Sequence, residues 1–270
     1  MSNAPKDSKR TTKEKAAAAR AAAEAEQRRR DRRVRLIGGT AIVVAVALIV
    51  GLGVWGSKQG TASASGTVAD AKVPAGVNGN GGSDPWGVPY NKVSGKPTLA
   101  IWEDFQCPSC GQFERSFGAA VTKLADEGKM NLVWRPTTFL DDRFAPTSPN
   151  PYSSHKAAMA WGCAIDAGKA KQFHTTVFAN QPANEGDGYT DAQILGFATT
   201  AGITGDALTT FKTCVTNKTY DQWVTNSYRA FQDAGVPGTP TAYLNGTEVP
   251  AATLSDMAAL EKLIASTPAS

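Results

Sequence analysis

Residues 102–114 read WEDFQCPSCGQFE and contain a closely spaced pair of cysteines. Cys107 and Cys110 stand two residues apart, directly after an apolar, strand-like segment at 97–105 and at the start of a helix-like run. A cysteine at a helix N-terminus lies beside free backbone N–H groups and the positive end of the helix dipole. Both effects favour a thiolate, so we expect a depressed pKa for Cys107. Pro108 suits the first helical turn, where its missing N–H costs nothing.

The charged residues divide the chain into two parts. Residues 1–35 hold 12 Lys/Arg and 5 Asp/Glu, which leaves 16 basic and 19 acidic residues in the rest of the 270-residue chain. The main body therefore has no basic excess that would attract phosphates, and we do not expect a nucleic-acid-binding domain. Residues 1–35 are predicted to form a basic cytoplasmic tail that fixes topology and touches anionic lipid.

An apolar segment follows the basic tail. Residues 36–54, LIGGTAIVVAVALIVGLGV, carry no charge and as a helix would span roughly 28 Å, close to the hydrocarbon thickness of a bilayer. With basic residues before it and Trp55 at the interface, the pattern predicts a transmembrane helix over 36–55 with a cytoplasmic N-terminus. A buried core helix is one alternative. A cleaved signal peptide is another, because residues 62–64 read ASA and resemble a cleavage site.

The remaining sequence predicts a linker and one folded domain. Residues 56–83 are mostly small and polar, which is typical of a flexible linker, and the domain is expected at 84–268. Asn245-Gly246 is a strong hairpin signal between two short strands. The predicted elements are, in order, a strand at 97–105, a helix from Cys107 to about Glu127, a strand at 130–135, a Pro-rich loop at 141–153, a mostly helical insertion at about 150–234, strands at 241–246 and 247–250, and a helix at 253–266.

Three roles are open for Cys107 and Cys110, because cysteines outside a bacterial-type membrane should be paired or reactive. Structural zinc sites use closely spaced clusters, for which His155 and His174 are not placed, although a site of all four cysteines is an alternative. The two histidines fit surface or helix-packing positions better. A purely structural bridge would close too short a loop to restrain the unfolded chain much. A redox pair is favoured, because a stabilised thiolate is a good leaving group.

Several motifs together resemble one family. EDFQCPSCGQFE at 103–114, the helical insertion and GVPGTPTAYLNG at 235–246 are similar to the DsbA-like branch of the thioredoxin superfamily, and more narrowly to its membrane-anchored actinobacterial members. The resemblance covers about 95–266. It implies an α/β, thioredoxin-like fold with a helical insertion domain, here preceded by one transmembrane helix. It also implies a protein thiol–disulfide oxidoreductase that needs no cofactor and no metal.

The resemblance makes Cys107 and Cys110 the catalytic pair, with Pro108 and Ser109 completing the active-site motif. Many relatives have a histidine at the position of Ser109, where it helps to hold the thiolate. A serine hydroxyl donates one hydrogen bond but carries no charge, so the oxidising power is expected to differ.

Other residues also receive roles by resemblance. Thr239-Pro240 would be the cis-proline site, whose backbone groups pair with an extended substrate peptide; a trans-proline entering a strand is the alternative. Cys163 and Cys214, 51 positions apart, would form a structural disulfide in the insertion, with a resolving pair or two independent thiols as alternatives. Glu103 is a candidate proton mediator for the second cysteine. Many relatives carry that acid two positions earlier, so a solvated or hydrogen-bonding strand-end residue is the alternative.

These inferences predict an extracytoplasmic enzyme that introduces disulfides into exported proteins. Its partners would be reduced exported substrates and, by resemblance, a quinone-coupled membrane reoxidant of the vitamin K epoxide reductase-like type. The chain would be a single-pass protein of the cell membrane, with its C-terminal domain outside. A disulfide isomerase or reductase is one alternative, and a non-catalytic, chaperone-like binding module on the same fold is another.

Overall fold

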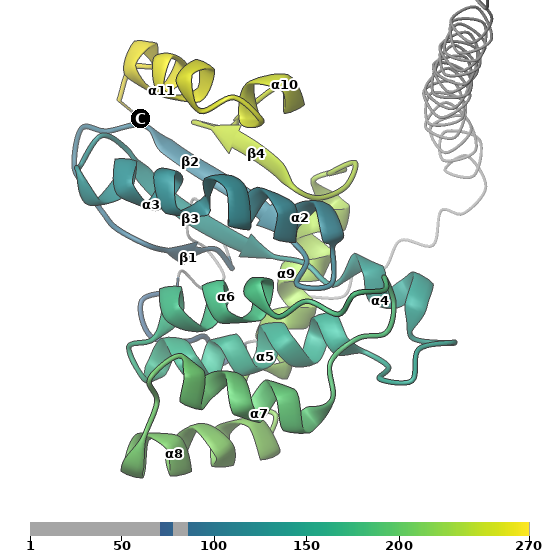
Figure 1. The fold of residues 1–270 in the computed structure, drawn as a ribbon. Coiled ribbons are helices and arrows are strands. Elements are labelled where there is room, and N and C mark those ends of the chain that lie inside the picture. Colours follow the sequence, from purple (N-terminus) through teal and green to yellow (C-terminus); the bar gives the residue numbers. More distant parts are fainter. Residues whose placement is uncertain (1–70, 78–85, 270) are drawn as a thin grey trace, which may run out of the picture. The chain divides into compact units, whose positions relative to one another are not determined.

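A five-stranded sheet forms the centre of the computed structural model, which describes residues 71–77 and 86–269 (Figure 1). The strands are β1 (Val88–Pro89), β2 (Thr98–Glu103), β3 (Asn131–Pro136), β4 (Thr241–Leu244) and β5 (Thr247–Glu248). Their order in the sheet is β1-β3-β2-β4-β5. Strands β2 and β3 are parallel, whereas the other three neighbouring pairs are antiparallel. The parallel pair requires a crossover connection, which the helix after Cys107 supplies.

The helices form layers around this sheet. In Figure 1, α2 and α3 lie in front of the sheet and α9 lies behind it, while α5 to α8 form a separate helical layer below. The helices are α2 (Pro108–Phe113), the π-helix η1 (Glu114–Gly118), α3 (Ala119–Asp126), α4 (Phe139–Phe144), α5 (Ser153–Asp166), α6 (Ala170–Ala179), α7 (Asp191–Thr200), α8 (Gly205–Thr216), α9 (Asp221–Asp233), α10 (Ala251–Leu254) and α11 (Met257–Ser266). Helices α4 to α9 are inserted between β3 and β4.

The central strand β2 is buried on both faces, as its apolar sequence TLAIWE predicts. Ile101 on one face pairs in register with Trp134 of β3. Trp102, on the opposite face, packs edge-on against Phe231 of α9 with ring centroids 5.5 Å apart. The strand is therefore held by side chains on both sides, and its C-terminal end delivers the chain directly to Cys107.

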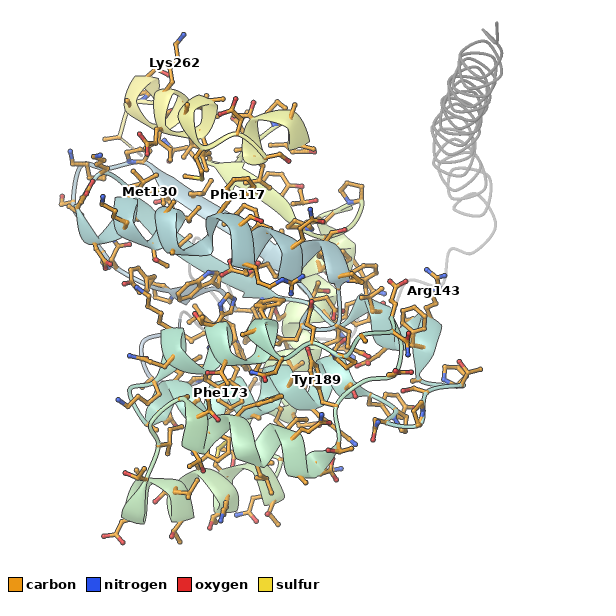
Figure 2. The ribbon with its side chains drawn as sticks, viewed as in Figure 1. Phe117, Met130, Arg143, Phe173, Tyr189 and Lys262 are labelled. Atoms are coloured by element: carbon orange, nitrogen blue, oxygen red, sulfur yellow. A yellow bond between two sulfur atoms is a disulfide. The ribbon has the colours of Figure 1, made fainter. Side chains whose placement is uncertain are left out.

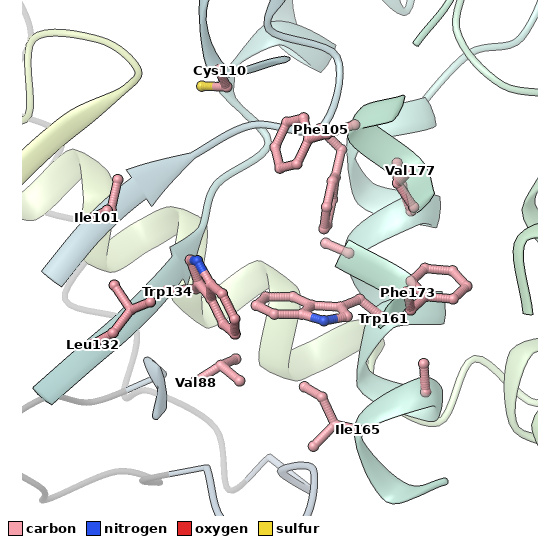
Figure 3. Close-up of a cluster of buried hydrophobic side chains, with 14 of the residues drawn as sticks. Val88, Ile101, Phe105, Cys110, Leu132, Trp134, Trp161, Ile165, Phe173 and Val177 are labelled. Atoms are coloured by element: carbon pink, nitrogen blue, oxygen red, sulfur yellow. The ribbon is translucent and has the colours of Figure 1, made fainter. Parts of the chain in front are cut away.

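Aromatic side chains join the sheet to the helical layer. Trp134 of β3 meets Trp161 of α5, with ring centroids 6.1 Å apart, and Phe105 packs against Trp161 from the loop after β2 (Figure 3). Phe173 and Tyr189 are fully buried within the helical layer (Figure 2). This shared core fixes the insertion against the sheet, so that both parts contribute to the region around Cys107.

Helix α5 admits close neighbours because small residues line it. Ala157, Ala158, Ala160 and Ala164 are all buried. At Gly162 an added Cβ would lie 2.7 Å from the Tyr220 ring. The absence of a side chain at this glycine therefore lets Tyr220 pack against the backbone of α5.

Strands β2 to β5 agree with those predicted, whereas β1 was not predicted. The turn at Asn245-Gly246 has positive φ values of 49° and 81°. Two other predictions are wrong. The Pro-rich loop expected at 141–153 begins as α4, so the inserted helices start at Phe139 and not at about residue 150. The helix expected at 253–266 is divided into α10 and α11, because Asp256 caps a new helix by accepting from the N–H groups of Ala258 and Ala259.

Part of the segment predicted as a flexible linker at 56–83 is packed instead. Residues 71–77 pack on the folded domain: the Ala75 N–H donates to Asp166 at 2.9 Å, and Val77 is buried. Small residues suggested flexibility, but they also fit closely against a surface. The transmembrane helix predicted at 36–55 lies outside the described residues. None of the helices in 71–77 and 86–269 is long and apolar enough to cross a membrane.

Candidate active site

Cys107 and Cys110 lie at the beginning of the crossover helix. Cys107 is the N-cap residue of α2, with Pro108 in its first turn, and its carbonyl accepts the Gly111 N–H at 3.1 Å. Both cysteines are free thiols. Cys107 is 6% exposed and Cys110 is completely buried, whereas Pro108 and Ser109 between them face solvent. An approaching thiol or disulfide therefore meets Cys107 before Cys110.

The two sulfur atoms have opposite electrostatic environments. The side chain of Cys110, with further contributions from Thr239 and the backbone N–H groups of Ser109 and Cys110, lowers the pKa of Cys107 to about 6 against the effect of burial. Burial raises the pKa of Cys110 well above its ordinary value, and a charge on Cys107 raises it further. At neutral pH the accessible sulfur is mainly a thiolate and the buried sulfur is a thiol, which is the division of roles that thiol–disulfide exchange needs.

A proline loop faces the accessible sulfur. The Thr239–Pro240 peptide bond is cis, the isomer that the resemblance implies. Cys107 Sγ lies 3.3 Å from the Thr239 carbonyl oxygen, although the residues are 132 positions apart. Strand β4 begins at Thr241 and pairs with β2, and this pairing brings the loop beside the start of α2. The described structure thus unites the two sequence motifs into one site.

The helical insertion holds the loop before Cys107 in place. The Gln181 side-chain amide donates to the carbonyl oxygens of Phe105 and Cys107, each at 2.9 Å. The Tyr189 hydroxyl donates to the same Phe105 oxygen at 2.7 Å. These supports were not predicted, because nothing in the local sequence links polar residues at 181 and 189 to a loop more than 70 positions earlier.

A buried carboxylate fixes the other side of this loop. Asp104 is completely buried and accepts the N–H groups of Gln106 and Leu140, at 2.8 and 3.1 Å, and the hydroxyl of Ser154. Burial raises the pKa of Asp104 to about 8. Gln106 continues the network by donating to Asp141. Asp104 is therefore a positioning residue for the loop.

Glu103 is buried and not solvated. Its Oε2 lies 3.0 Å from Nε2 of His174, which comes from α6. Glu114, the first residue of η1, approaches the other ring nitrogen, with its Oε2 3.9 Å from Nδ1 of His174. The ligand atoms of these three residues all lie within 4.8 Å of one another. Glu114 was not predicted to belong to the site, and His174 was predicted only as a surface or helix-packing residue.

The other two cysteines are joined in the structure. Cys163 of α5 and Cys214 of α8 form a disulfide within the helical layer. This bridge lies in a different part of the fold from Cys107 and connects two helices of the insertion. His155 is also separate from the active-site pair, and its Nε2 contacts Asp221 at 2.9 Å.

These features together define a class of protein. A Cys-x-x-Cys pair at the start of a crossover helix, opposite a cis-proline before a sheet strand, is the arrangement of a thioredoxin-fold dithiol protein. A pocket lined in part by Gln106, Pro108 and Arg115 opens beside the helix N-terminus and extends along residues 181–188.

Comparison with known proteins identifies the family. A family model described as Thioredoxin matches residues 92–265. The chain is 28% identical to reduced DsbA from Mycobacterium tuberculosis, over 71% of this chain and 88% of that one, with a TM-score of 0.51. It is 27% identical to the disulfide bond oxidoreductase DsbG of the same organism, over 71% and 84% of the two chains, also with a TM-score of 0.51. No curated protein matches the sequence.

A further solved structure supports the fold. The MdbA thiol-disulfide oxidoreductase from Actinomyces oris is 22% identical, over 68% of this chain and 87% of that one, with a TM-score of 0.54. The chain belongs to the thioredoxin family, as a DsbA-like thiol–disulfide oxidoreductase.

Proposed function

We propose that this protein introduces disulfides into exported proteins through the Cys107-Pro-Ser-Cys110 pair. The observation that carries the proposal is the position of Cys107 Sγ, 3.3 Å from the carbonyl of Thr239 in a cis-proline loop. That loop leaves backbone groups beside the sulfur, where an extended client segment can add as a strand. The lowered pKa of Cys107 stabilises the reduced form, so the disulfide form is an oxidant.

The reaction has two exchange steps. A client thiolate attacks Cys107 Sγ of the enzyme disulfide, the Cys107–Cys110 bond breaks, and Cys110 leaves with the electron pair and takes up a proton. A second client thiolate then attacks the client sulfur in this mixed disulfide. Cys107 leaves as a stabilised thiolate, the client departs with a disulfide, and both active-site cysteines are reduced.

Location and reoxidation belong to the same proposal. The uncharged segment 36–54 and the basic residues before it support a single-pass membrane anchor with the catalytic domain outside. There the substrates are reduced exported proteins, and the reduced pair passes its electrons to a quinone-coupled membrane oxidase of the vitamin K epoxide reductase-like type. The pocket beside Pro108 offers a surface for such partners.

The test uses the full-length chain in detergent and a reduced model protein whose disulfides are required for its activity. The wild-type chain, oxidised beforehand, should restore the model protein's activity, while Cys107→Ser should not. Mixed with the oxidised model protein instead, Cys110→Ala should trap a mixed disulfide, because the Cys107 thiolate opens a client disulfide and no Cys110 thiol remains to displace the client. Unchanged oxidation by Cys107→Ser would refute the proposal and leave a non-catalytic binding module.

The direction of electron flow needs a second measurement. Equilibration of the pair with glutathione gives its reduction potential, which should lie well above that of thioredoxin for an oxidant. A potential near that of thioredoxin would instead identify a reductase or isomerase.

A further inference from the structure

Three buried titratable side chains from three different elements meet beside the cysteine pair, and we refer to Glu103, Glu114 and His174 as the buried triad. Their side chains are 4%, 8% and 2% exposed, respectively, so Glu114 has the most contact with solvent. The charge of Glu103 raises the pKa of Cys110, and a charge on Cys107 raises the pKa of Glu103. The triad therefore connects electrostatically with the reacting sulfurs.

The chain makes specific room for Glu114. This residue opens the π-helix η1, and π-helical turns occur frequently at functional sites. An added Cβ at Gly118 would overlap Oε2 of Glu114, so the glycine leaves space for the carboxyl group. A polar side chain enclosed in this way requires a partner, because an uncompensated buried carboxyl is costly.

Aromatic rings enclose His174. Its ring stacks on Trp134 with centroids 4.6 Å apart, and Phe178, Trp161 and Phe105 pack around it at 4.9, 5.3 and 5.6 Å. Two polar atoms of the triad, Oε1 of Glu103 and Nδ1 of His174, have no hydrogen-bond partner. Each of these atoms can therefore accept or donate a proton without breaking an existing hydrogen bond.

The geometry fits protons better than a metal ion. Glu103 approaches Nε2 of His174 at 3.0 Å and Glu114 approaches Nδ1 at 3.9 Å, so each carboxyl group meets a different ring nitrogen. The two carboxyl groups also contact each other. A zinc ion would need both carboxylates and a single ring nitrogen at about 2.0–2.2 Å. An imidazole that meets a different carboxyl group at each nitrogen can instead exchange a proton at each.

We propose that Glu114 and His174 form a proton relay between solvent and Glu103, which exchanges the proton with Cys110. This inference rests on the proposed function and adds the route by which the buried thiol gains and loses its proton. When Cys107 is bonded to an oxidant sulfur, Glu103 takes the proton of Cys110. The Cys110 sulfur attacks Cys107 Sγ, the bond to the oxidant breaks, and the oxidant sulfur leaves with the electron pair. The proton leaves Glu103 by way of His174 and Glu114.

The electrostatic environment supports this assignment. Burial raises the pKa of Glu103 and of Glu114 to about 8 in each case, and burial lowers the pKa of His174 to about 4. The charge of Glu103 further raises the pKa of Glu114, so the two carboxyl groups tend to hold one proton between them. Near neutral pH such a pair both accepts and releases protons, while the thiol of Cys110 hardly ionises by itself.

The test measures resolution of a glutathione mixed disulfide at Cys107. Reduced full-length chain in detergent is mixed with oxidised glutathione, quenched in acid and alkylated, and free thiols are counted by mass across pH 5–10. The variants are Glu114→Gln, which keeps the shape without an acid, and Glu114→Asp, which keeps the acid in a shorter side chain. Glu127→Gln is the matched control, because Glu127 is an exposed carboxylate that pairs with Lys129.

The relay predicts that resolution in wild type rises with an inflection near pH 8. In Glu114→Gln it should be about tenfold slower at pH 7 and recover only as Cys110 itself ionises. Glu114→Asp should retain the inflection and react faster than Glu114→Gln, and Glu127→Gln should match wild type. His174→Gln should slow resolution near neutral pH as Glu114→Gln does.

Other outcomes would overturn the relay. A purely structural role makes Glu114→Gln the milder variant and lowers the rate by the same factor at every pH. Stoichiometric binding of added zinc to the wild-type reduced chain, lost in Glu114→Gln, would make the triad a metal site. The client-oxidation assay of the wild-type chain decides the proposed function separately, since the relay is judged only by comparing variants.

Discussion

Removal of the Cys163–Cys214 disulfide should destabilise the folded domain without removing thiol oxidation. The bridge closes a loop with a sequence separation of 51 and joins α5 to α8. In the chain-entropy model, release of such a loop increases the entropy of the unfolded chain and lowers the free energy of unfolding by about 4 kcal/mol. With a urea slope of about 2 kcal/mol per molar, the unfolding midpoint of Cys163→Ala/Cys214→Ala should fall by about 2 M.

The assay compares urea unfolding of wild type, the double variant and Cys107→Ser, each with and without a reductant. Reductant should lower the midpoint of Cys107→Ser, which keeps this bridge but cannot form a Cys107–Cys110 disulfide, and should not lower the midpoint of the double variant. Client oxidation by the double variant should equal that of wild type well below its midpoint. A loss of less than about 1 kcal/mol would refute the loop argument. A folded double variant without activity would instead show that the second pair relays electrons.

Three further predictions test the active site and the packing. The rate of alkylation of Cys107 in the reduced chain should rise with a midpoint near pH 6. Cys110→Ala should raise that midpoint, because the side chain of Cys110 makes the largest contribution to the lowered pKa of Cys107. A midpoint near the pKa of free cysteine would contradict the thiolate argument. Glu103 has a raised pKa, so its contribution to stability is present below its unfolded pKa and is lost as pH rises to about 8. Glu103→Gln should therefore become more stable relative to wild type between pH 5 and pH 9 in chemical unfolding, and a constant difference would contradict the burial of this carboxyl. Gly162→Ala should lower the free energy of unfolding by about 1–3 kcal/mol because its Cβ meets the Tyr220 ring. Gly196→Ala in α7, where the added Cβ meets nothing, should raise it by about 0.5–1 kcal/mol, and equal effects of the two substitutions would show that the contact is unimportant.

Local sequence patterns were sufficient for much of the sheet and for the reactive helix. The apolar run before Cys107, the cysteine spacing and the Asn245-Gly246 turn act within a few residues, so their structural consequences could be read directly. The break between α10 and α11 was also encoded locally, by Asp256 at a helix start, but the apolar periodicity on both sides concealed it. Short-range signals thus conflicted at this position, and the capping hydrogen bonds decided the outcome.

Most of the residues around the active-site pair could not be predicted, because their contacts are long-range. Glu103 meets His174 across 71 positions, and Gln181 reaches the Cys107 carbonyl across 74. No spacing rule relates such residues, and an isolated glutamate such as Glu114 in a helix is normally a surface residue. Only the packing of α6 against the crossover helix makes these side chains neighbours.

The insertion is therefore part of the active site and more than an addition to a thioredoxin core. The start of α2 favours a thiolate only while the Cys107 backbone keeps its N-cap geometry. That geometry depends on Gln181 and Tyr189, whose bonds hold carbonyl oxygens on both sides of Gln106. Because α6 also supplies His174, one helix of the insertion and the loop after it influence both sulfurs. A change in the packing of this layer would alter the accessible thiolate and the buried thiol together, which a core without the insertion could not do.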